Sequence, residues 1–457
     1  MSRGVIIAAP GSGSGKTTLT LALLRRLRDS GVSVASGKVG PDYIDPAYHA
    51  AASGRACHNL DTWSMSDRTL SALIADLQRD ATAVVVEGVM GLFDGAPDGR
   101  GSAADLSRRT GWPVVLVVDA SGMAASVAAL VHGFTSYDPA VEVAGVIFNR
   151  TGSARHGELL RRAMRPVGIP VFGCVTRSEF LELPDRHLGL VQAREHPDLE
   201  GFLARAAEQI GREVDTGALL AAARPARVGP PEGGHGLPEG GHGLPVLGRR
   251  IAVARDDAFA FCYPYVLDAW RRAGCELSFF SPLDDEPPVE DADAVYMPGG
   301  YPELHAGRLA DATRFMAGLR RSAERGAAVY GECGGYMVLG ERLVDGEGVS
   351  HRMAGLLPVE TSFESPRLSL GYREVELAED GVLGRMGDRF RGHEFHFASV
   401  LAQAPAPALF QTFNAEMAPL GDAGLRVGGV MGSFVHLMDR CGGRRDVRDS
   451  PVVRRVR

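Results

Sequence analysis

The chain has 457 residues and a formal net charge of −7, with 45% hydrophobic and 23% charged residues. A chain of that length is too long to fold around a single hydrophobic core, so we expect two or three domains. The acidic balance disfavours a general nucleic-acid surface, and no apolar run reaches the roughly 20 residues of a membrane helix. The sequence therefore predicts a cytoplasmic protein that binds neither nucleic acid nor membranes.

Lysine is almost absent from this chain. Of the 49 lysine and arginine residues, only Lys16 and Lys38 are lysines. A compact ammonium on a flexible stem and a planar guanidinium are not chemically interchangeable. Lysines retained in such an arginine-rich chain therefore indicate a chemical need, and both lie in the first 40 residues.

Residues 1–222 alternate short runs rich in Val and Ile with amphipathic stretches. The runs lie at residues 5–9, 83–86, 114–118 and 145–148. This pattern predicts a parallel sheet with helices on both faces. We expect residues 1–222 to form one α/β domain.

A glycine-rich loop follows the first run and precedes a stretch with helical spacing. The loop consists of Gly11, Ser12, Gly13, Ser14, Gly15, Lys16, Thr17 and Thr18. In a phosphate-binding loop, backbone N–H groups surround the phosphates, Lys16 reaches the β and γ oxygens, and the Thr17 hydroxyl coordinates Mg²⁺. Pro10 stands where the standard motif has its first glycine, and Gly11 and Gly13 supply a permissive backbone instead.

Two further loops carry carboxylates suited to a magnesium-nucleotide site. The segment 87–95 follows an expected buried strand, and the segment 38–46 contains Lys38 between prolines and aspartates. An acid at the carboxyl edge of a parallel strand faces the ligand crevice. The candidate carboxylates are Asp42, Asp45, Glu87 and Asp94.

The α/β pattern stops at residues 223–248, where Gly and Pro dominate. The heptapeptide at 231–237 is repeated at 238–244, and a solvated linker is the expected structure. A second α/β pattern fills residues 249–442. Residues 443–457 are basic and patternless, so we expect a flexible tail.

Cys333 is the candidate nucleophile of this second domain. It lies in Gly-Glu-Cys-Gly-Gly after an expected strand at 327–330, which is typical of a nucleophile elbow. The helix N-terminus behind it favours the thiolate, although a buried structural cysteine is the alternative. Gly300 and Gly334 offer backbone N–H groups to an oxyanion, and His436 is the candidate base.

The phosphate loop and the segments 38–46 and 87–95 together resemble the corrinoid a,c-diamide synthases of cobalamin biosynthesis, whose N-terminal domain is similar to dethiobiotin synthetase. The C-terminal motifs resemble class I glutamine amidotransferases. The resemblance implies a P-loop parallel-sheet domain followed by a flavodoxin-like class I glutaminase α/β domain. It also implies that ATP phosphorylates a carboxylate of a corrinoid acid and that ammonia from L-glutamine displaces the phosphate.

The resemblance further implies the roles of individual residues. Lys16 and Lys38 would stabilise the transferring phosphoryl group, Asn149 would read adenine, and Cys333 would form a thioester with His436 as base. The magnesium ligands would be Thr17, Asp45 and Glu87. The residues near the substrate would be Asp42, Tyr43, Asp45 and Asp94. Many class I glutaminases place a glutamate two residues after the histidine, and Met438 stands there instead.

Several alternatives stay open at this level. The arginine-rich composition indicates a GC-rich coding genome, which is typical of aerobic bacteria. The aerobic pathway uses hydrogenobyrinic acid, so the composition favours this acid over cobyrinic acid as the substrate. Cobyric acid synthase and the nickel-sirohydrochlorin diamide synthase are alternatives within the enzyme class. A partitioning-type P-loop ATPase switch with a degenerate glutaminase is the alternative from another class. The order of the two amidations, the route of ammonia, the orientation of His436 and the oligomeric state, a homodimer included, are left open.

Overall fold

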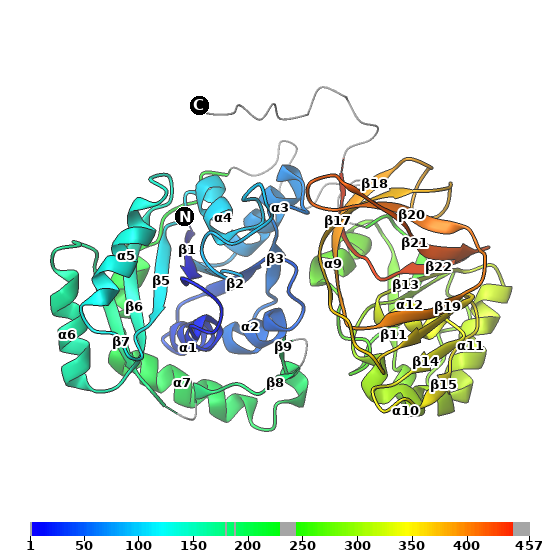
Figure 1. Cartoon of the computed structure of the whole chain (residues 1–457), viewed down its shortest axis with the longest axis horizontal. Coiled ribbons are helices and arrows are strands. Elements are labelled where there is room, and N and C mark those ends of the chain that lie inside the picture. The colour runs from blue at the N-terminus through cyan, green and yellow to red at the C-terminus, as the bar shows by residue number, and fades with distance from the viewer. Residues whose placement is uncertain (1, 179–180, 187–188, 229–243, 442–457) are drawn as a thin grey trace. The chain divides into compact units, whose positions relative to one another are not determined.

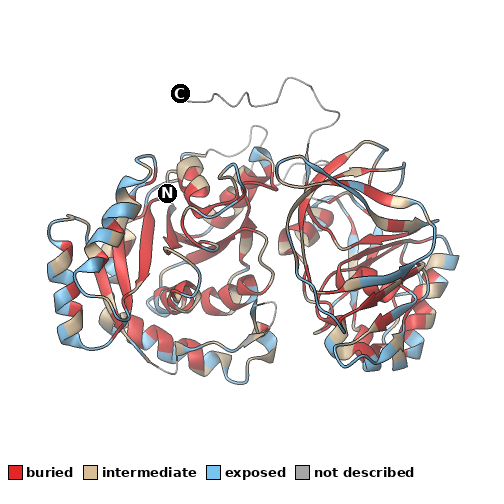
Figure 2. Ribbon diagram, viewed as in Figure 1, coloured by how far each residue is buried: buried red, intermediate tan, exposed pale blue. Residues whose placement is uncertain are grey.

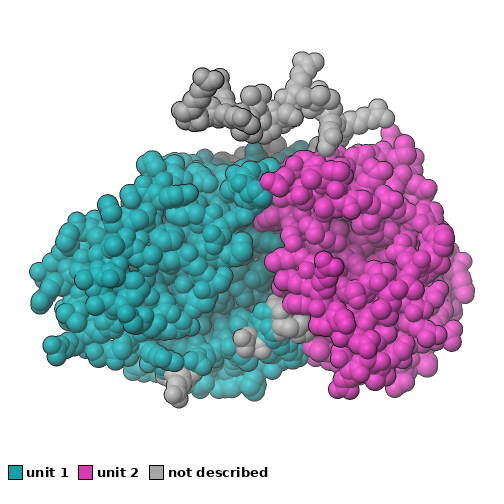
Figure 3. Space-filling model, viewed as in Figure 1, with its two compact units in different colours: residues 1–242, 260–272 teal, residues 243–259, 273–457 magenta. Residues whose placement is uncertain are grey.

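The computed structural model describes residues 2–178, 181–186, 189–228 and 244–441 (Figure 1). The chain divides into two compact units, residues 1–242 with 260–272 and residues 243–259 with 273–457 (Figure 3). The linker repeat lies outside the described residues except for Leu244, and the predicted basic tail at 443–457 lies wholly outside them. The boundaries predicted at 222, 248 and 442 stay predictions.

Within the described residues, unit 1 contains a seven-stranded sheet in the order β3-β2-β4-β1-β5-β6-β7, and every pairing is parallel. Its strands are β1 (Arg3–Ala8), β2 (Val34–Val39), β3 (His58–Leu60), β4 (Ala83–Glu87), β5 (Val114–Asp119), β6 (Val143–Thr151) and β7 (Val171–Thr176). The strands are almost wholly buried, which explains their continuous apolar runs (Figure 2). The predicted parallel sheet is therefore confirmed.

Helices cover both faces of this sheet, as right-handed crossovers require (Figure 1). The helices α1 (Lys16–Asp29), α2 (Asp45–Ser53) and α7 (Leu199–Glu213) share one face. The other face carries α3 (Asp67–Gln78), α4 (Ala103–Thr110), α5 (Ser126–Ser136) and α6 (Ala154–Met164). Unit 1 also contains the hairpin β8 (Asp185–Arg186) and β9 (Gly189–Leu190), the turn η2 (Ala193–Glu195), and helices α8 (Thr216–Ala222) and α9 (Pro264–Arg272).

Serine side chains define where several of these helices begin. Ser66, Ser102 and Ser153 each accept a hydrogen bond from the backbone N–H three residues later. Such caps satisfy donors that a helix N-terminus leaves without a partner. The helix α1 differs, because it begins after Gly15 with no side-chain cap. Its first N–H groups are therefore available to a ligand.

Unit 2 contains a ten-stranded sheet in the order β11-β10-β12-β13-β22-β21-β20-β17-β18-β23 within the described residues. The strands are β10 (Arg250–Ala254), β11 (Glu276–Phe280), β12 (Ala294–Met297), β13 (Ala328–Glu332), β17 (Ser369–Leu377), β18 (Arg389–His396), β20 (Ala408–Phe413), β21 (Pro419–Val427), β22 (Val430–Ser433) and β23 (His436–Cys441). Pairing is parallel from β11 to β22 and antiparallel in the rest. The sheet thus joins a parallel half to an antiparallel half.

A smaller sheet and short helices complete unit 2. The sheet has the order β15-β14-β16-β19 in the part of the chain that is described. Its strands are β14 (Arg342–Val344), β15 (Ser350–Arg352), β16 (Val359–Ser362) and β19 (Ser399–Gln403). The helical elements are η3 (Pro282–Asp284), η4 (Pro302–His305), α10 (Ala306–Asp311), α11 (Thr313–Glu324) and α12 (Gly334–Leu339). A core of Phe315, Val329 and neighbouring apolar side chains holds these elements together.

Candidate active sites

The predicted phosphate loop connects β1 to α1 in unit 1. Gly13 and Gly15 have φ values of 78° and 83°, a backbone conformation that favours glycine. A Cβ atom on Gly15 would lie 2.2 Å from the Asn149 side-chain nitrogen, so the loop has no room for a larger residue there. Lys16 Nζ donates to the Met90 carbonyl at 2.7 Å. The backbone of the loop therefore has the conformation expected of a phosphate-binding loop, and the Lys16 side chain is directed to the segment 87–95.

A cavity of about 460 Å³ opens beside this loop. Asn149 reaches it from the end of β6 and donates from Nδ2 to the Ser14 carbonyl at 3.0 Å. The other lining residues are Gly13, Gly15, Lys16, Thr17, Thr18, Arg150, Thr176, Arg177, Ser178, Leu181, Glu182, Leu183 and Leu190. Its volume lies within the usual range for small-molecule sites, and the uncapped α1 N-terminus attracts anions.

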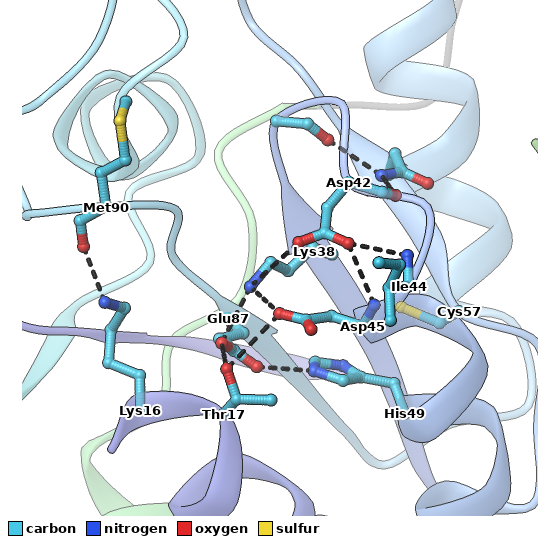
Figure 4. A network of polar contacts seen from close by, with 12 residues as sticks. Lys16, Thr17, Lys38, Asp42, Ile44, Asp45, His49, Cys57, Glu87 and Met90 are labelled. Atoms are coloured by element: carbon cyan, nitrogen blue, oxygen red, sulfur yellow. Dashed lines mark hydrogen bonds and ion pairs between the residues drawn. The ribbon is translucent and has the colours of Figure 1, made fainter. Parts of the chain in front are cut away.

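A buried cluster of opposite charges lies beside the loop (Figure 4). Lys38 Nζ is 2.5 Å from Asp45 Oδ2, 2.8 Å from Glu87 Oε1 and 3.9 Å from Asp42 Oδ2. Thr17 Oγ1 donates to Glu87 Oε1 at 2.6 Å. Lys38 and Glu87 meet because they are register partners on the parallel strands β2 and β4. Sheet register thus brings together residues that are far apart in the sequence.

The charges in this cluster depend on one another. Burial alone would raise the pKa of Glu87, but Lys38 and His49 outweigh burial and hold it below its ordinary value. Burial and the Asp42 carboxylate raise the pKa of Asp45 to about 7. Burial would lower the pKa of Lys38, but Asp45 and Glu87 raise it above its ordinary value. Lys38, together with His49, therefore keeps Glu87 ionised.

The same cluster offers oxygen atoms to a divalent cation. Thr17 Oγ1, Asp45 Oδ2 and Glu87 Oε1 converge on one region, and oxygen donors are the ligands that Mg²⁺ prefers. No group of three or more His, Cys, Asp or Glu side chains in the described part of the chain is arranged to hold a metal by itself. A metal here would therefore share its ligands with the Thr17 hydroxyl and with a bound nucleotide.

His49 belongs to this site and was missed in the sequence. It lies four residues after Asp45 on α2, and its Nε2 atom is 2.7 Å from Glu87 Oε2. Burial would lower its pKa, but Cys57 and Glu87 raise it to about 10. The spacing of four residues places the Asp45 and His49 side chains on one helix face, and this spacing is the feature of the sequence from which His49 could have been predicted.

The predicted substrate residues do not all lie together. Asp42 Oδ1 accepts hydrogen bonds from the backbone N–H groups of Ile44 and Asp45, so Asp42 shapes the loop. Asp94 is exposed and accepts from the Gly91 N–H at 2.9 Å. Tyr43 instead stacks on the Tyr263 ring, with 4.3 Å between ring centroids. Asp42 and Asp45 adjoin the lysine cluster, whereas Tyr43 belongs to an aromatic group.

Cys333 lies in unit 2 between β13 and α12 as the nucleophile elbow predicts. Its φ of 46° is rare for a residue with a side chain, and such strain is typical of functional turns. A Cβ atom on Gly335 would lie 2.0 Å from the Met297 carbonyl oxygen, and one on Gly331 would lie 2.8 Å from the Gly335 carbonyl carbon. Both flanking positions therefore require glycine.

The Cys333 and His436 side chains border the same small space. A Cβ atom on Gly299 would lie 3.2 Å from His436 Nε2 and 3.3 Å from Cys333 Cβ. A Cβ atom on Gly334 would lie 3.1 Å from the Gly300 nitrogen, so the two candidate oxyanion donors lie in adjoining turns. The structure thus brings the predicted nucleophile, base and oxyanion groups together.

The resting electrostatics differ from what the sequence indicates. Burial and the nearby Glu303 raise the pKa of the Cys333 thiol, and the Gly334 N–H lowers it too little to compensate. Burial, with His393 and His396, holds the pKa of His436 well below its ordinary value. The pair therefore rests as thiol and neutral imidazole, and the helix N-terminus does not produce a thiolate by itself.

Comparisons with known proteins agree with both halves. The CobQ/CobB/MinD/ParA nucleotide binding domain family matches residues 5–191, and the CobB/CobQ-like glutamine amidotransferase domain family matches residues 250–440. The chain is 54% identical over 442 residues to a hydrogenobyrinate a,c-diamide synthase of Brucella anthropi, covering 96% of this chain and 99% of that protein. The corresponding protein of Rhizobium meliloti is 50% identical over 440 residues, with 95% and 99% covered.

The chain belongs to the hydrogenobyrinate a,c-diamide synthase family. It is a glutamine-dependent amidoligase of cobalamin biosynthesis that uses ATP. The predicted family, the two-part α/β fold and the enzyme class are thereby confirmed. Among the described residues, no helix combines the length and the apolar character that crossing a membrane demands.

Proposed function

We propose that this diamide synthase amidates the a and c carboxylates of hydrogenobyrinic acid. Relatives that are hydrogenobyrinate a,c-diamide synthases support this acid, as does the arginine-rich composition. The observation that carries the proposal is the Lys38 ammonium held between Asp45 and Glu87 beside the phosphate loop. A lysine in that position can stabilise negative charge on a transferring phosphoryl group.

The first half-reaction takes place at the phosphate loop. A carboxylate oxygen of the acid attacks the γ-phosphorus of ATP and ADP leaves, while Lys16 and Lys38 neutralise charge on the phosphoryl oxygens. Ammonia then attacks the acyl carbon of the acyl phosphate, and inorganic phosphate leaves as the amide forms. Thr17, Asp45 and Glu87 would hold Mg²⁺, which neutralises phosphate charge when it is bound.

The second half-reaction supplies the ammonia. His436 takes the proton of the Cys333 thiol, and the sulfur attacks the side-chain carbonyl carbon of glutamine. The N–H groups of Gly300 and Gly334 stabilise the oxyanion that forms. The imidazolium gives its proton to the departing nitrogen, and water hydrolyses the γ-glutamyl thioester to glutamate. Because the thiol rests protonated, proton transfer to His436 accompanies the attack.

Two substitutions separate the half-reactions. We expect Cys333→Ala to abolish glutamine-dependent amidation and to preserve amidation from added ammonia, because the acyl phosphate still forms. Lys16→Ala should abolish both, because it removes a group that binds the transferring phosphoryl. Phosphate release and mass spectrometry of the corrinoid product measure these outcomes. Equal loss of both activities in folded Cys333→Ala would contradict a separable nucleophile.

The substrate is tested by offering defined acids to the purified enzyme. Hydrogenobyrinic acid should give a product with two amides, and turnover of cobyrinic acid alone would overturn the proposal. Phosphate release should require both the tetrapyrrole acid and a nitrogen source. ATP turnover stimulated by DNA or by a protein partner would instead favour the partitioning-type ATPase switch.

We also propose that the reaction takes place in the cytoplasm, where ATP is available. Six free cysteines support a reducing compartment. Fractionation of cells tests this location. Light scattering of the purified protein decides whether it is a monomer or a homodimer.

A further inference from the structure

We infer that Glu332 is the positioning residue that orients His436 toward Cys333, in place of the acid that class I glutaminases carry two residues after the histidine. This inference rests on the proposed roles of Cys333 and His436. Met438 stands at that usual position, and its thioether cannot carry a negative charge. Glu332 instead comes from β13, directly before the nucleophile in the chain.

The carboxylate of Glu332 faces the histidine ring. Glu332 Oε2 is 3.8 Å from His436 Nδ1, and both side chains are about 1% exposed. This distance is longer than a hydrogen bond and within the range of an ion pair. His436 Nε2 lies on the other side of the ring, next to the space that it shares with Cys333. The ring therefore stands between an acid and the nucleophile, as in a Ser-His-Asp triad.

The remaining contacts fix the carboxylate in this position. Oε1 accepts from the Tyr330 hydroxyl at 2.9 Å and from the Leu437 N–H at 3.1 Å, and Oε2 accepts from the Tyr296 hydroxyl at 2.8 Å. The Leu437 bond holds the peptide that follows His436, so Glu332 anchors the backbone of the histidine as well as facing its ring. These groups are donors, and a carboxylate, which only accepts, satisfies them all.

The position has a chemical consequence during thioester formation. When His436 takes the thiol proton on Nε2, its Nδ1–H carries part of the new positive charge toward Glu332. A carboxylate there stabilises the imidazolium and keeps the ring from turning away, and it forms no bond itself. Among the described residues, the titratable groups placed near His436 include Glu332 from β13, Cys333 from the elbow, and His393 and His396 from β18. Of these four, Glu332 is the one that can carry negative charge toward Nδ1.

The test is Glu332→Gln in the full-length enzyme. We expect kcat for glutamine-dependent amidation to fall about 100-fold, with KM for glutamine and ammonia-dependent amidation changed less than about 3-fold. Alkylation of Cys333 by the glutamine analogue 6-diazo-5-oxo-L-norleucine, followed by peptide mass spectrometry, should slow in parallel. The pH profile of this alkylation should shift to lower pH, because the imidazolium is less stable without the carboxylate and the pKa of His436 falls.

A rescue variant and a control make the result specific. The double substitution Glu332→Gln with Met438→Glu returns a carboxylate to the usual class I position, and we expect it to regain part of the lost kcat. The control is Glu360→Gln on β16, a partly exposed acid that pairs with Arg342 at 3.8 Å, and it should stay within about 3-fold of wild type.

The remaining outcomes decide against the inference. Unchanged glutamine-dependent activity in Glu332→Gln would show that His436 needs no acid there. Equal loss of the glutamine-dependent and ammonia-dependent activities would reduce Glu332 to a structural residue. If Glu332→Gln does not fold, Tyr296→Phe, which removes one donor from Oε2, must selectively lower glutamine-dependent kcat. Retention of glutamine-dependent activity by Cys333→Ala would instead refute the proposed nucleophile, and the inference with it.

Discussion

Each half of this enzyme buries a glutamate at the end of a parallel strand, but the two environments are opposite. Glu87 lies between Lys38 and His49, which hold its pKa below the ordinary value against burial. Glu332 is surrounded by tyrosine hydroxyls and a backbone N–H, and burial raises its pKa to about 7. A cationic neighbour keeps a buried carboxylate ionised at all times, whereas neutral donors leave it responsive to a charge that forms during the reaction.

The largest effect on the difference between the two glutamates is expected from Lys38→Met. This substitution leaves Asp45 and Glu87 buried without their cation, so we expect the free energy of unfolding to fall by about 3 kcal/mol. Amidation from either nitrogen source should fall about 1000-fold, because charge on the phosphoryl group loses its partner. Denaturant unfolding and phosphate release measure both effects.

The control for that change is Arg25→Met. Arg25 pairs with Asp29 at 3.0 Å and with the exposed Glu200 at 2.6 Å on the surface of unit 1. Exposed pairs contribute less than about 1 kcal/mol, so the control should remain near wild type in both assays. Equal effects of the two substitutions would show that the buried Lys38 pairs contribute no more to stability or to activity than a surface ion pair does.

The second prediction concerns pH. The folded-state pKa of Glu332 is about 7, above its ordinary value of 4.5, so its contribution to stability is complete below 4.5 and is lost as pH rises through 7. Between acidic and alkaline pH, the free energy of unfolding of the wild type should therefore fall by about 3 kcal/mol relative to that of Glu332→Gln. Parallel unfolding curves of the two proteins across that range would contradict the environment assigned to Glu332.

The third prediction has the smallest effect and concerns His49. Its contact with Glu87 Oε2 orients the carboxylate whose other oxygen faces Thr17. We expect His49→Ala to raise the Mg²⁺ concentration for half-maximal phosphate release about 10-fold, as changes behind a metal ligand usually do. His49→Gln keeps a hydrogen-bond donor and should restore part of that loss. An unchanged Mg²⁺ requirement would separate His49 from the metal site.

The sequence allowed the local features of both sites to be predicted. The phosphate loop and the elbow at Cys333 are short patterns with fixed chemistry, and both have the expected backbone in the structure. His49 and Glu332 were not predicted, because their partners are set by helix packing and strand register. Glu332 adjoins Cys333 in the sequence, yet its approach to His436 depends on how β23 lies in the sheet.

The direction of the thiol pKa could not be predicted either. A helix N-terminus favours the thiolate, and that argument is visible in the sequence around Cys333. Burial and the position of Glu303 act the other way, and both depend on the folded structure. Local motifs therefore identified the reacting groups, and the tertiary fold decided their protonation.

The bond between Lys16 and the Met90 carbonyl bears on the kinetic order of substrate addition. Met90 has a φ of 48°, a strained backbone for a side-chain-bearing residue, and Lys16 is its donor at 2.7 Å. We expect Lys16 to turn to the phosphates when ATP binds and to leave this carbonyl, which would free the segment that carries Asp94. We therefore expect an ordered mechanism in which ATP binds before the acid, visible in initial-rate kinetics as uncompetitive inhibition against ATP by an unreactive analogue of the acid.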